Sequence, residues 1–209
     1  YYPHYEVGGD YYDFMQLSED VIGFCIADVS GKGMSAALLM SNFQASLRAL
    51  FTADAGFTDL IRKLNTLVVT NSAGERFITL FLARYNVKTR VLEYVNAAHN
   101  PPVIINTVTG TSSVRRETCV GVVMRKEMPC GRTGTLQVQN HTKIICYTDG
   151  LSELKDESGM DLGISPLVKH FPNRKPLSDN IDSLISDIDI SAGNSRLFDD
   201  VSILAIEIP

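Results

Sequence analysis

The alternation of apolar and polar positions divides the chain into short strand-like runs and longer helix-like runs. Residues 10–28 contain two runs of about eight residues around the polar Ser18-Glu19-Asp20, a pattern that predicts a β-hairpin. Residues 33–51 are rich in Ala, Leu and Met without a breaker and predict a helix that follows a Gly-rich turn. A second helix is expected with Thr58 as its N-cap.

The remainder of the chain alternates short apolar runs with connections rich in Gly, Thr and Asn, which indicates mainly strands. Strands are expected at 77–86, 90–98, 102–106, 111–116, 135–139, 143–149 and 201–208. Helical segments are expected at 149–156, from Ser165 onward and at 177–188. Because strands come in blocks with helices inserted between hairpins, the sequence favours an α+β fold with antiparallel sheet. No linker or repeat is visible, so residues 1–209 are expected to form one domain.

Composition and charge narrow the classes of function. The 209 residues carry a formal net charge of -5, which argues against a nucleic-acid partner because phosphates are neutralised by clustered Lys and Arg. No apolar run approaches the ~18 residues of a membrane span, so no direct membrane contact is expected. The first residues lack the features of a signal peptide, and the start at Tyr1 suggests a piece of a longer protein. The four cysteines form no CxxC pair and are expected to be reduced, as in a cytosolic protein.

The acidic residues include 15 Asp against 9 Glu, and two of these aspartates are placed symmetrically about the first turn. Asp10 lies nine residues before Glu19 and Asp28 nine after it, so a simple register puts them opposite each other at the open end of the hairpin. Opposed like charges are destabilising unless a cation lies between them. In a slipped register each Asp would merely end a strand and cap a turn. The hairpin alone leaves both readings open.

Further aspartates occupy matching positions on two later strands. Asp149 ends the strand-like run 143–149, and Asp199-Asp200 precede the run 201–208. In an antiparallel pair the end of one strand lies beside the start of its neighbour. These acids are therefore expected to converge with Asp10 and Asp28 on one sheet edge. Two divalent cations there would suggest two-metal hydrolysis of a phosphate ester.

Six segments, in this order along the chain, carry a resemblance to a known family. They are EVGGDYYDF (6–14), IADVSGKGMSAALLMS (26–41), RFITLFLARYN (76–86), AAHNPP (97–102), YTDGLSE (147–153) and FDDVSILAIE (198–207). Together they resemble the metal-dependent protein phosphatase (PPM) family, in the bacterial branch named after the stage II sporulation protein E. The resemblance implies an α-β-β-α sandwich, with two antiparallel sheets flanked by helices on both outer faces.

The same resemblance implies a metal site and a reaction. Family members hold two Mn²⁺ or Mg²⁺ ions, which activate water to hydrolyse phosphoserine or phosphothreonine. Carried over by position, the implied catalytic residues are Asp10, Asp28, Asp149 and Asp199. Asp28 would bridge both ions, the carbonyl of Val29 would bind one of them, and Asp10 would be its outer ligand. Asp149 and Asp199 would bind the second ion, with Asp200 as the alternative to Asp199.

Several positions depart from the family pattern. The eukaryotic branch has a phosphate-gripping Arg near its N-terminus and a His after the bridging Asp, whereas no Arg precedes Asp10 here and Ser30 stands at the His position. The phosphate-binding group and the general acid are therefore unassigned, with Lys32 and metal-bound water as candidates. His99 is expected to hold a loop backbone rather than to act as a ligand or proton donor. Ala98 stands where the branch usually has Gly.

The resemblance also implies partners. The expected substrate is a phosphorylated anti-sigma-factor antagonist with a STAS domain, and the longer protein is expected to carry an upstream sensor or regulatory domain. The domain is also expected to be cytoplasmic and to be able to form a homodimer. In the full-length protein it could be tethered to a membrane sensor. The rival hypothesis is a catalytically silent module that keeps the fold and binds the same partner.

Overall fold

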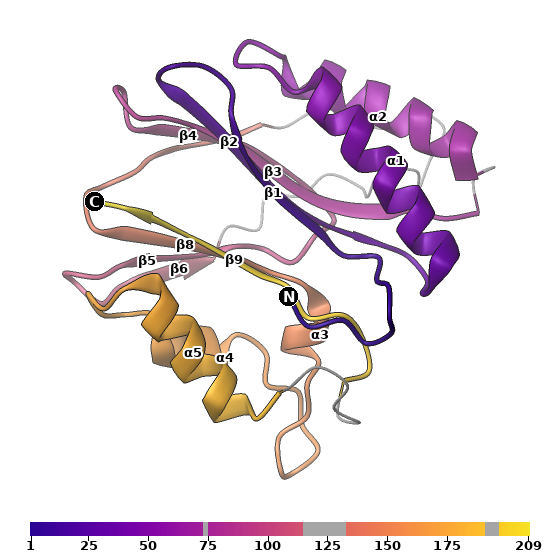
Figure 1. Ribbon diagram of the computed structural model, residues 1–209. Helices are drawn as coiled ribbons and strands as arrows, with labels where there is room; N and C mark the ends of the chain where they lie inside the picture. The colour runs from indigo at the N-terminus through magenta and orange to yellow at the C-terminus, as the bar shows by residue number, and fades with distance from the viewer. Residues whose placement is uncertain (73–74, 115–132, 191–196) are drawn as a thin grey trace. The chain divides into compact units, whose positions relative to one another are not determined.

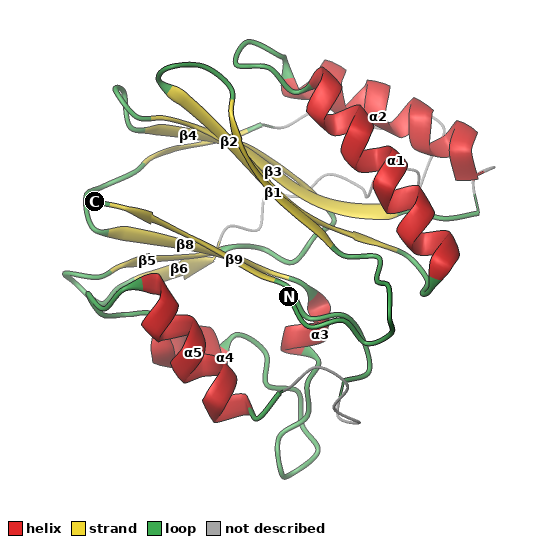
Figure 2. Cartoon of the chain, in the orientation of Figure 1, coloured by secondary structure: helices red, strands yellow, loops and turns green. Residues whose placement is uncertain are grey.

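The computed structural model describes residues 1–72, 75–114, 133–190 and 197–209, which form two compact units. The first unit, here called the five-stranded unit, takes its described residues from Val7–His99 and Arg116–Gln137. The second, the four-stranded unit, takes them from Tyr1–Glu6, Asn100–Arg115 and Val138–Pro209. Each unit contains one antiparallel sheet and its own helices (Figures 1 and 2).

The five-stranded unit contains a sheet of strand order β1-β2-β3-β4-β7, in which every neighbouring pair is antiparallel. Its elements are β1 (Tyr11–Gln16), β2 (Val21–Val29), α1 (Met34–Leu50), α2 (Phe57–Ser72), β3 (Ile78–Asn86), β4 (Val91–Ala97) and β7 (Gly134–Gln137). The predicted hairpin, the first helix and the strand pair around residues 87–89 are confirmed. The strand expected at 135–139 begins one residue earlier and ends at Gln137.

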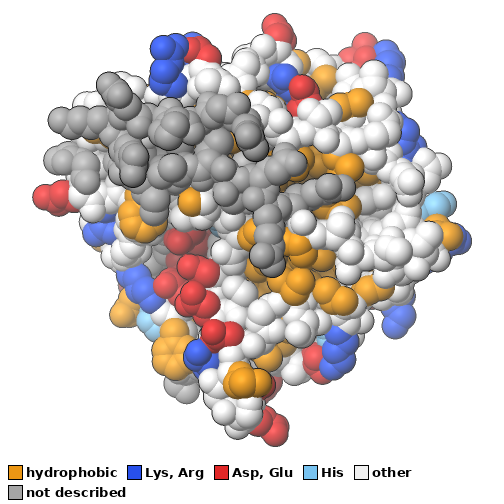
Figure 3. All heavy atoms as spheres, turned by 180° about the vertical axis from the view of Figure 1, so that it is seen from behind, with side chains coloured by type: hydrophobic (Ala, Val, Ile, Leu, Met, Phe, Trp, Pro, Cys, Tyr) orange, Lys and Arg blue, Asp and Glu red, His pale blue; other side chains and the backbone are white. Residues whose placement is uncertain are grey.

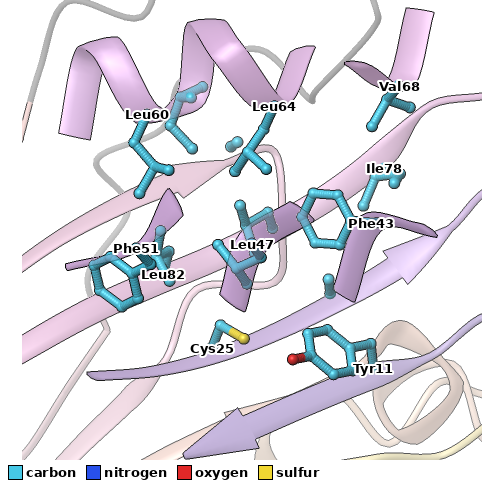
Figure 4. Close-up of a cluster of buried hydrophobic side chains, with 14 of the residues drawn as sticks. Tyr11, Cys25, Phe43, Leu47, Phe51, Leu60, Leu64, Val68, Ile78 and Leu82 are labelled. Atoms are coloured by element: carbon cyan, nitrogen blue, oxygen red, sulfur yellow. The ribbon is translucent and has the colours of Figure 1, made fainter. Parts of the chain in front are cut away.

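Helices α1 and α2 cover one face of this sheet (Figure 1). Helix α1 buries Leu39, Phe43 and Leu47, whose spacing of four residues puts them on one side of the helix. Figure 4 shows Phe43 and Leu47 in one apolar cluster with Cys25 of β2 and Leu82 of β3. Burial of this apolar surface is the main force that holds the helices on the sheet.

Helix α2 begins at Phe57, so the prediction that Thr58 is its N-cap is wrong. The reason lies in the core, because the Phe57 ring is buried against Phe51 at a centroid distance of 6.0 Å. The guanidinium carbon of Arg84 lies 5.0 Å from the centroid of the same ring. The amide of Leu60 donates to the carbonyl of Gly56, so the first helical hydrogen bond is accepted two residues before Thr58.

A polar clamp fixes α1 against the edge strand β1. Asp13 accepts two hydrogen bonds from the Arg48 guanidinium, at 2.6 and 2.7 Å, and one from the Tyr11 hydroxyl at 2.5 Å. Burial raises the pKa of Asp13, but the hydrogen bonds from Arg48, Tyr11 and the Phe14 amide outweigh it and hold the pKa below its usual range. Burial and the bond to Asp13 raise the pKa of Tyr11, so the phenol keeps its proton and donates it.

The four-stranded unit contains a sheet of order β6-β5-β8-β9, again antiparallel throughout. Its elements are β5 (Val103–Asn106), β6 (Ser112–Val114), β8 (Thr142–Tyr147), α3 (Asp149–Ser152), α4 (Ser165–His170), α5 (Leu177–Ile188) and β9 (Ile203–Ile208). The strand expected at 111–116 is present as β6, and its residues 115–116 lie outside the described residues. Helices α4 and α5 pack on one face of the sheet around Leu167 and Leu184 (Figure 1).

A fully buried lysine on β8 holds the connection between α4 and α5. The Lys143 ammonium donates to the carbonyls of Asn173 and Lys175 at 2.9 and 2.8 Å and to Asn180 Oδ1 at 2.6 Å. Burial lowers the pKa of Lys143, and the Glu207 carboxylate opposes that shift. Three acceptors match the three donors of an ammonium group, so the site is built for the charged form. This arrangement anchors the strand that leads to Asp149.

The α+β class with two antiparallel sheets and flanking helices is confirmed.

Cys25 and Cys146 are buried free thiols, and Cys119 and Cys130 lie outside the described residues. Within the described ranges, no helix has the length and apolar character needed to span a membrane. On the face drawn in Figure 3, the described Lys and Arg side chains lie dispersed rather than gathered in one patch.

We predict that Asp13→Asn lowers the midpoint of thermal unfolding at pH 7 by a few degrees, roughly 2–6 °C, because Arg48 loses its charged acceptor. The folded-state pKa of Asp13 lies below its usual 3.8, so the carboxylate's contribution is full above about pH 5 and is lost as the pH falls through the folded-state value. The difference from wild type should therefore shrink at pH 3. Melting curves followed by circular dichroism at both pH values test this, and an equal difference at the two pH values would contradict it.

Candidate metal centre

The first pair of predicted ligands lies at the open end of the β1–β2 hairpin. The register pairs Tyr11 with Ala27, and the amide of Val29 donates to the carbonyl of Gly9 at 3.3 Å. Between these two pairs, the ladder puts Asp10 opposite Asp28, as the simple register predicts. Tyr11 and Ala27 face the helices, so the side chains of Asp10 and Asp28 project from the other face of the sheet.

Gly9 allows the two strands to approach closely at this end. A Cβ atom on Gly9 would lie 2.9 Å from the carbonyl oxygen of Val29, which is the backbone group predicted to bind a metal. Asp10 is 7% exposed, and Asp28 is intermediate. Directly opposed residues in such a ladder have Cβ atoms about 5 Å apart, so two carboxylates are held together at a place where neither is freely solvated.

The second pair of acids lies at one end of the β8–β9 ladder. The amide of Thr148 donates to the carbonyl of Ser202 at 3.1 Å, and the amide of Ser202 donates to the hydroxyl of Thr148 at 2.9 Å. This crossing brings the start of α3, at Asp149, against the segment that precedes β9. A Cβ atom on Gly150 would lie 2.1 Å from the carbonyl oxygen of Asp200, so the two backbones are in contact.

The structure distinguishes Asp199 from Asp200 by their surroundings. Asp200 is 7% exposed, and its carboxylate accepts a hydrogen bond from the His4 amide at 2.8 Å. The neighbouring Tyr2 forms an antiparallel bridge with Val201, so Asp200 fastens the N-terminal segment. Asp199 is less buried, and its Oδ1 accepts a hydrogen bond from the Asp200 amide at 2.9 Å. Asp200 therefore ties the N-terminal segment to the start of β9, whereas the bond from Asp199 to the Asp200 amide is local to its own turn.

The predicted ligands are thus grouped as two pairs, one in each unit. In the part of the chain that the structure describes, no three His, Cys, Asp or Glu side chains form a group that could hold a metal ion. The donors are nevertheless of one chemical kind, since each is a carboxylate or a carbonyl oxygen. Oxygen donors suit hard cations such as Mg²⁺ and Mn²⁺, and close carboxylates of like charge are stabilised by such ions. The residues at both positions therefore fit the implied ions.

Two positions from the family pattern have structural partners. Ser30 stands where the eukaryotic branch has a His, and its hydroxyl accepts a hydrogen bond from the Phe77 amide at 2.9 Å. His99 bonds through its amide to Asn96 Oδ1 at 2.8 Å, and its Nδ1 lies 2.7 Å from the Thr79 hydroxyl. His99 was expected to hold a loop backbone; its imidazole instead contacts the Thr79 side chain on β3.

Sequence reasoning did not find Arg76 or Thr79. Arg76 donates to the carbonyl of Ser30 and, at 2.7 Å, to the hydroxyl of Ser35, so it joins the loop after β2 to the first turn of α1. Thr79 is directly opposite Asp28 in the β2–β3 register. Both residues lie within segment 76–86, which carries part of the family resemblance. That motif is the sequence feature that could have marked them as functional residues.

This fold is that of PP2C-type phosphatase domains. The SiaA-PP2C domain of Pseudomonas aeruginosa superimposes with a TM-score of 0.84 over 100% of this chain and 84% of that one, at 17% identity. The PP2C phosphatase domain of SpoIIE from Bacillus subtilis gives a TM-score of 0.79 over 99% of this chain and 61% of that one, at 14% identity. At these identities the likeness shows the fold.

The family follows from the sequence match. The family model described as "Stage II sporulation protein E (SpoIIE)" matches residues 18–209, and the chain belongs to this family. Phosphoserine phosphatase RsbU of Bacillus subtilis (strain 168) is 28% identical over 75% of this chain and 46% of its own length. The chain spans less than half the length of the curated relatives it matches. The predicted class of enzyme, a protein phosphatase, is confirmed at the level of the family.

We predict that Gly150→Ala destabilises the protein by roughly 1–3 kcal/mol, because the added methyl group overlaps the backbone of Asp200. Helix propensity alone predicts the opposite sign, since Ala is favoured over Gly in helices by about 1 kcal/mol. Urea unfolding followed by circular dichroism measures the difference. Gly56→Ala is the matched control, because a Cβ atom at Gly56 meets nothing within 4 Å. Equal stability of the two variants would show that Gly150 is not constrained by this contact.

Proposed function

We propose that residues 1–209 form one PPM-type phosphatase domain that hydrolyses phosphoserine or phosphothreonine in a protein substrate with two Mn²⁺ or Mg²⁺ ions. The observation that carries the proposal is the placement of aspartates at strand ends: Asp10 lies opposite Asp28, and the Gly150 backbone beside Asp149 contacts the Asp199–Asp200 segment. All are hard oxygen donors. Family membership supports the reaction class.

The proposal assigns a role to each ligand. Asp28 would bind both ions, Asp10 and the Val29 carbonyl would bind the first, and Asp149 and Asp199 would bind the second. Two bound divalent ions would lower the pKa of water and screen the charge of the phosphate. The carboxylates would hold the ions from backbone segments that are closely packed, because a Cβ atom at Gly9 or Gly150 would overlap the neighbouring carbonyl oxygen. Asp200 keeps the second segment in place through the His4 amide.

We predict that the wild-type domain hydrolyses p-nitrophenyl phosphate with Mn²⁺ and that EDTA abolishes this activity. Asp28→Asn should lower the rate by at least about 100-fold at saturating Mn²⁺, since losing an outer-shell partner of a ligand already costs 10- to 100-fold. Glu19→Gln, in the hairpin turn at the far end of the same strands, is the matched acidic control and should leave the rate unchanged. Equal, negligible rates for wild type and Asp28→Asn would favour the rival, a catalytically silent module.

Asp199 and Asp200 allow a matched comparison between neighbours. We expect Asp199→Asn to weaken Mn²⁺ binding and to abolish most of the activity while leaving the unfolding midpoint without metal close to wild type. Asp200→Asn should lower that midpoint, because the His4 amide loses a charged acceptor, and should retain activity at saturating Mn²⁺. Isothermal titration with Mn²⁺ and thermal unfolding of both variants decide the assignment. The reverse pattern would make Asp200 the ligand.

The substrate and partners belong to the same proposal. We place the domain in the cytoplasm, acting on a phosphorylated STAS-domain anti-sigma-factor antagonist and controlled by an upstream sensor or regulatory domain of the longer protein. The name of its relative RsbU, a phosphoserine phosphatase, supports the phosphoserine chemistry. Phosphate release from a phosphoserine-bearing STAS protein, compared with a phosphoserine peptide of the same local sequence, tests the substrate. A peptide rate equal to the protein rate would count against recognition of the STAS fold.

Light scattering on the full-length protein tests the proposed homodimer, which a monomeric mass would exclude.

A further inference from the structure

A row of polar side chains crosses three strands of the five-stranded unit. Asp10 lies opposite Asp28, and Asp28 lies opposite Thr79 in the register of β2 and β3. Ile78 and Leu80, on either side of Thr79, belong to the apolar core beneath the helices. Because side chains alternate along a strand, Thr79 shares the opposite face with the two aspartates. The Thr79 hydroxyl is therefore the next polar group to the predicted bridging ligand.

His99 reaches Thr79 from the turn that follows β4. Ala98 has a φ of 56°, in the left-handed region, and so reverses the chain just after the strand. The His99 amide is held by Asn96 Oδ1 at 2.8 Å, and the His99 side chain is 95% buried, with 5% of its surface exposed. Its Nδ1 lies 2.7 Å from the Thr79 hydroxyl oxygen. His99 is thus held at its backbone by Asn96 and at its side chain by Thr79.

The hydroxyl of Thr79 can donate only one hydrogen bond, so its direction depends on His99. If Nδ1 accepts, the Thr79 hydrogen points to the imidazole and the oxygen lone pairs face the aspartates, which is unfavourable. If Nδ1–H donates, the Thr79 hydrogen is released toward Asp28. Opposed Cβ atoms lie about 5 Å apart and both side chains project from the same face of the sheet, so one water between the hydroxyl and the carboxylate can bridge them.

We propose that His99 and Thr79 are positioning residues, in which His99 Nδ1–H donates to Thr79 and Thr79 in turn donates toward the Asp28 carboxylate and orients it. This inference rests on the proposed function, because it needs Asp28 to be a metal ligand. Carboxylates that bind metals are generally fixed by hydrogen bonds from outer-shell partners, and a carboxylate opposed to a second one needs such a donor most. No proton leaves either residue in this arrangement.

The main test is Mn²⁺ binding by Thr79→Val, which keeps the shape of the side chain and removes the hydroxyl. Isothermal titration should show binding weaker by about 10- to 100-fold, with a matching shift in the Mn²⁺ concentration that half-activates hydrolysis. Thr79→Ser keeps the hydroxyl and should restore wild-type binding. Thr142→Val is the matched control, because Thr142 is a buried strand residue whose hydroxyl bonds to the Gln139 carbonyl, and it should bind Mn²⁺ as wild type does.

His99 gives a second, independent comparison. His99→Asn can place an amide donor near the position of Nδ1 and should keep most of the affinity for Mn²⁺, whereas His99→Phe fills the space without a donor and should lose about as much as Thr79→Val. Because the donor and non-donor variants are compared at the same buried position, a purely structural role would not separate them. This comparison does not depend on the folding of Thr79→Val.

The outcomes separate this inference from the function on which it rests. A wild-type domain that neither binds Mn²⁺ nor hydrolyses p-nitrophenyl phosphate overturns the proposed function and this inference with it. A wild-type domain that does both, with Thr79→Val and His99→Phe binding Mn²⁺ equally well, overturns the positioning role alone. Weaker binding in those two variants, with recovery in Thr79→Ser and His99→Asn, supports it.

Discussion

The register that sets Asp10 opposite Asp28 is the constraint on which the rest of the five-stranded unit depends. Two like charges at directly opposed positions destabilise a hairpin, and strand pairing alone would favour a shift away from that contact. A shift by one residue would turn every side chain of β1 to the other face. Tyr11 would then leave the core beneath the helices. The apolar core therefore fixes the position of the charges, and a bound cation is the natural means of stabilising them.

In the four-stranded unit, close backbone contact rather than strand register alone fixes the position of the acidic residues. Gly150 lies so close to the Asp200 carbonyl that no side chain fits there. Asp200 is in turn held by the amide of His4. Lys143 fastens β8, the strand that ends before Asp149, to the connection between α4 and α5. Both pairs of acids thus lie on segments whose backbone is in close contact with a neighbouring segment.

Local sequence predicted the features that depend on short-range patterns. The hairpin of β1 and β2 and the antiparallel pairing of β8 with β9 followed from the strand pattern, whereas the sequence left the hairpin register open and the structure has the simple register. The start of α2 was missed because burial of Phe57 outweighs the capping preference of Thr58. The contact between Thr79 and His99 was missed because it depends on the left-handed conformation of a single alanine, which no sequence period reveals.

The excess of Asp over Glu also has a geometric reason at these positions. Opposed residues in a ladder have Cβ atoms about 5 Å apart, and a Mg²⁺ or Mn²⁺ ion needs oxygens at about 2 Å on each side. A carboxylate one bond beyond Cβ fits that gap, whereas the extra methylene of Glu would crowd it or fold the carboxylate away. Asp also has one fewer side-chain torsion to immobilise when a ligand is bound. Short acids at strand ends would therefore suit the proposed two-ion site, while the long acids are suited to solvated surfaces.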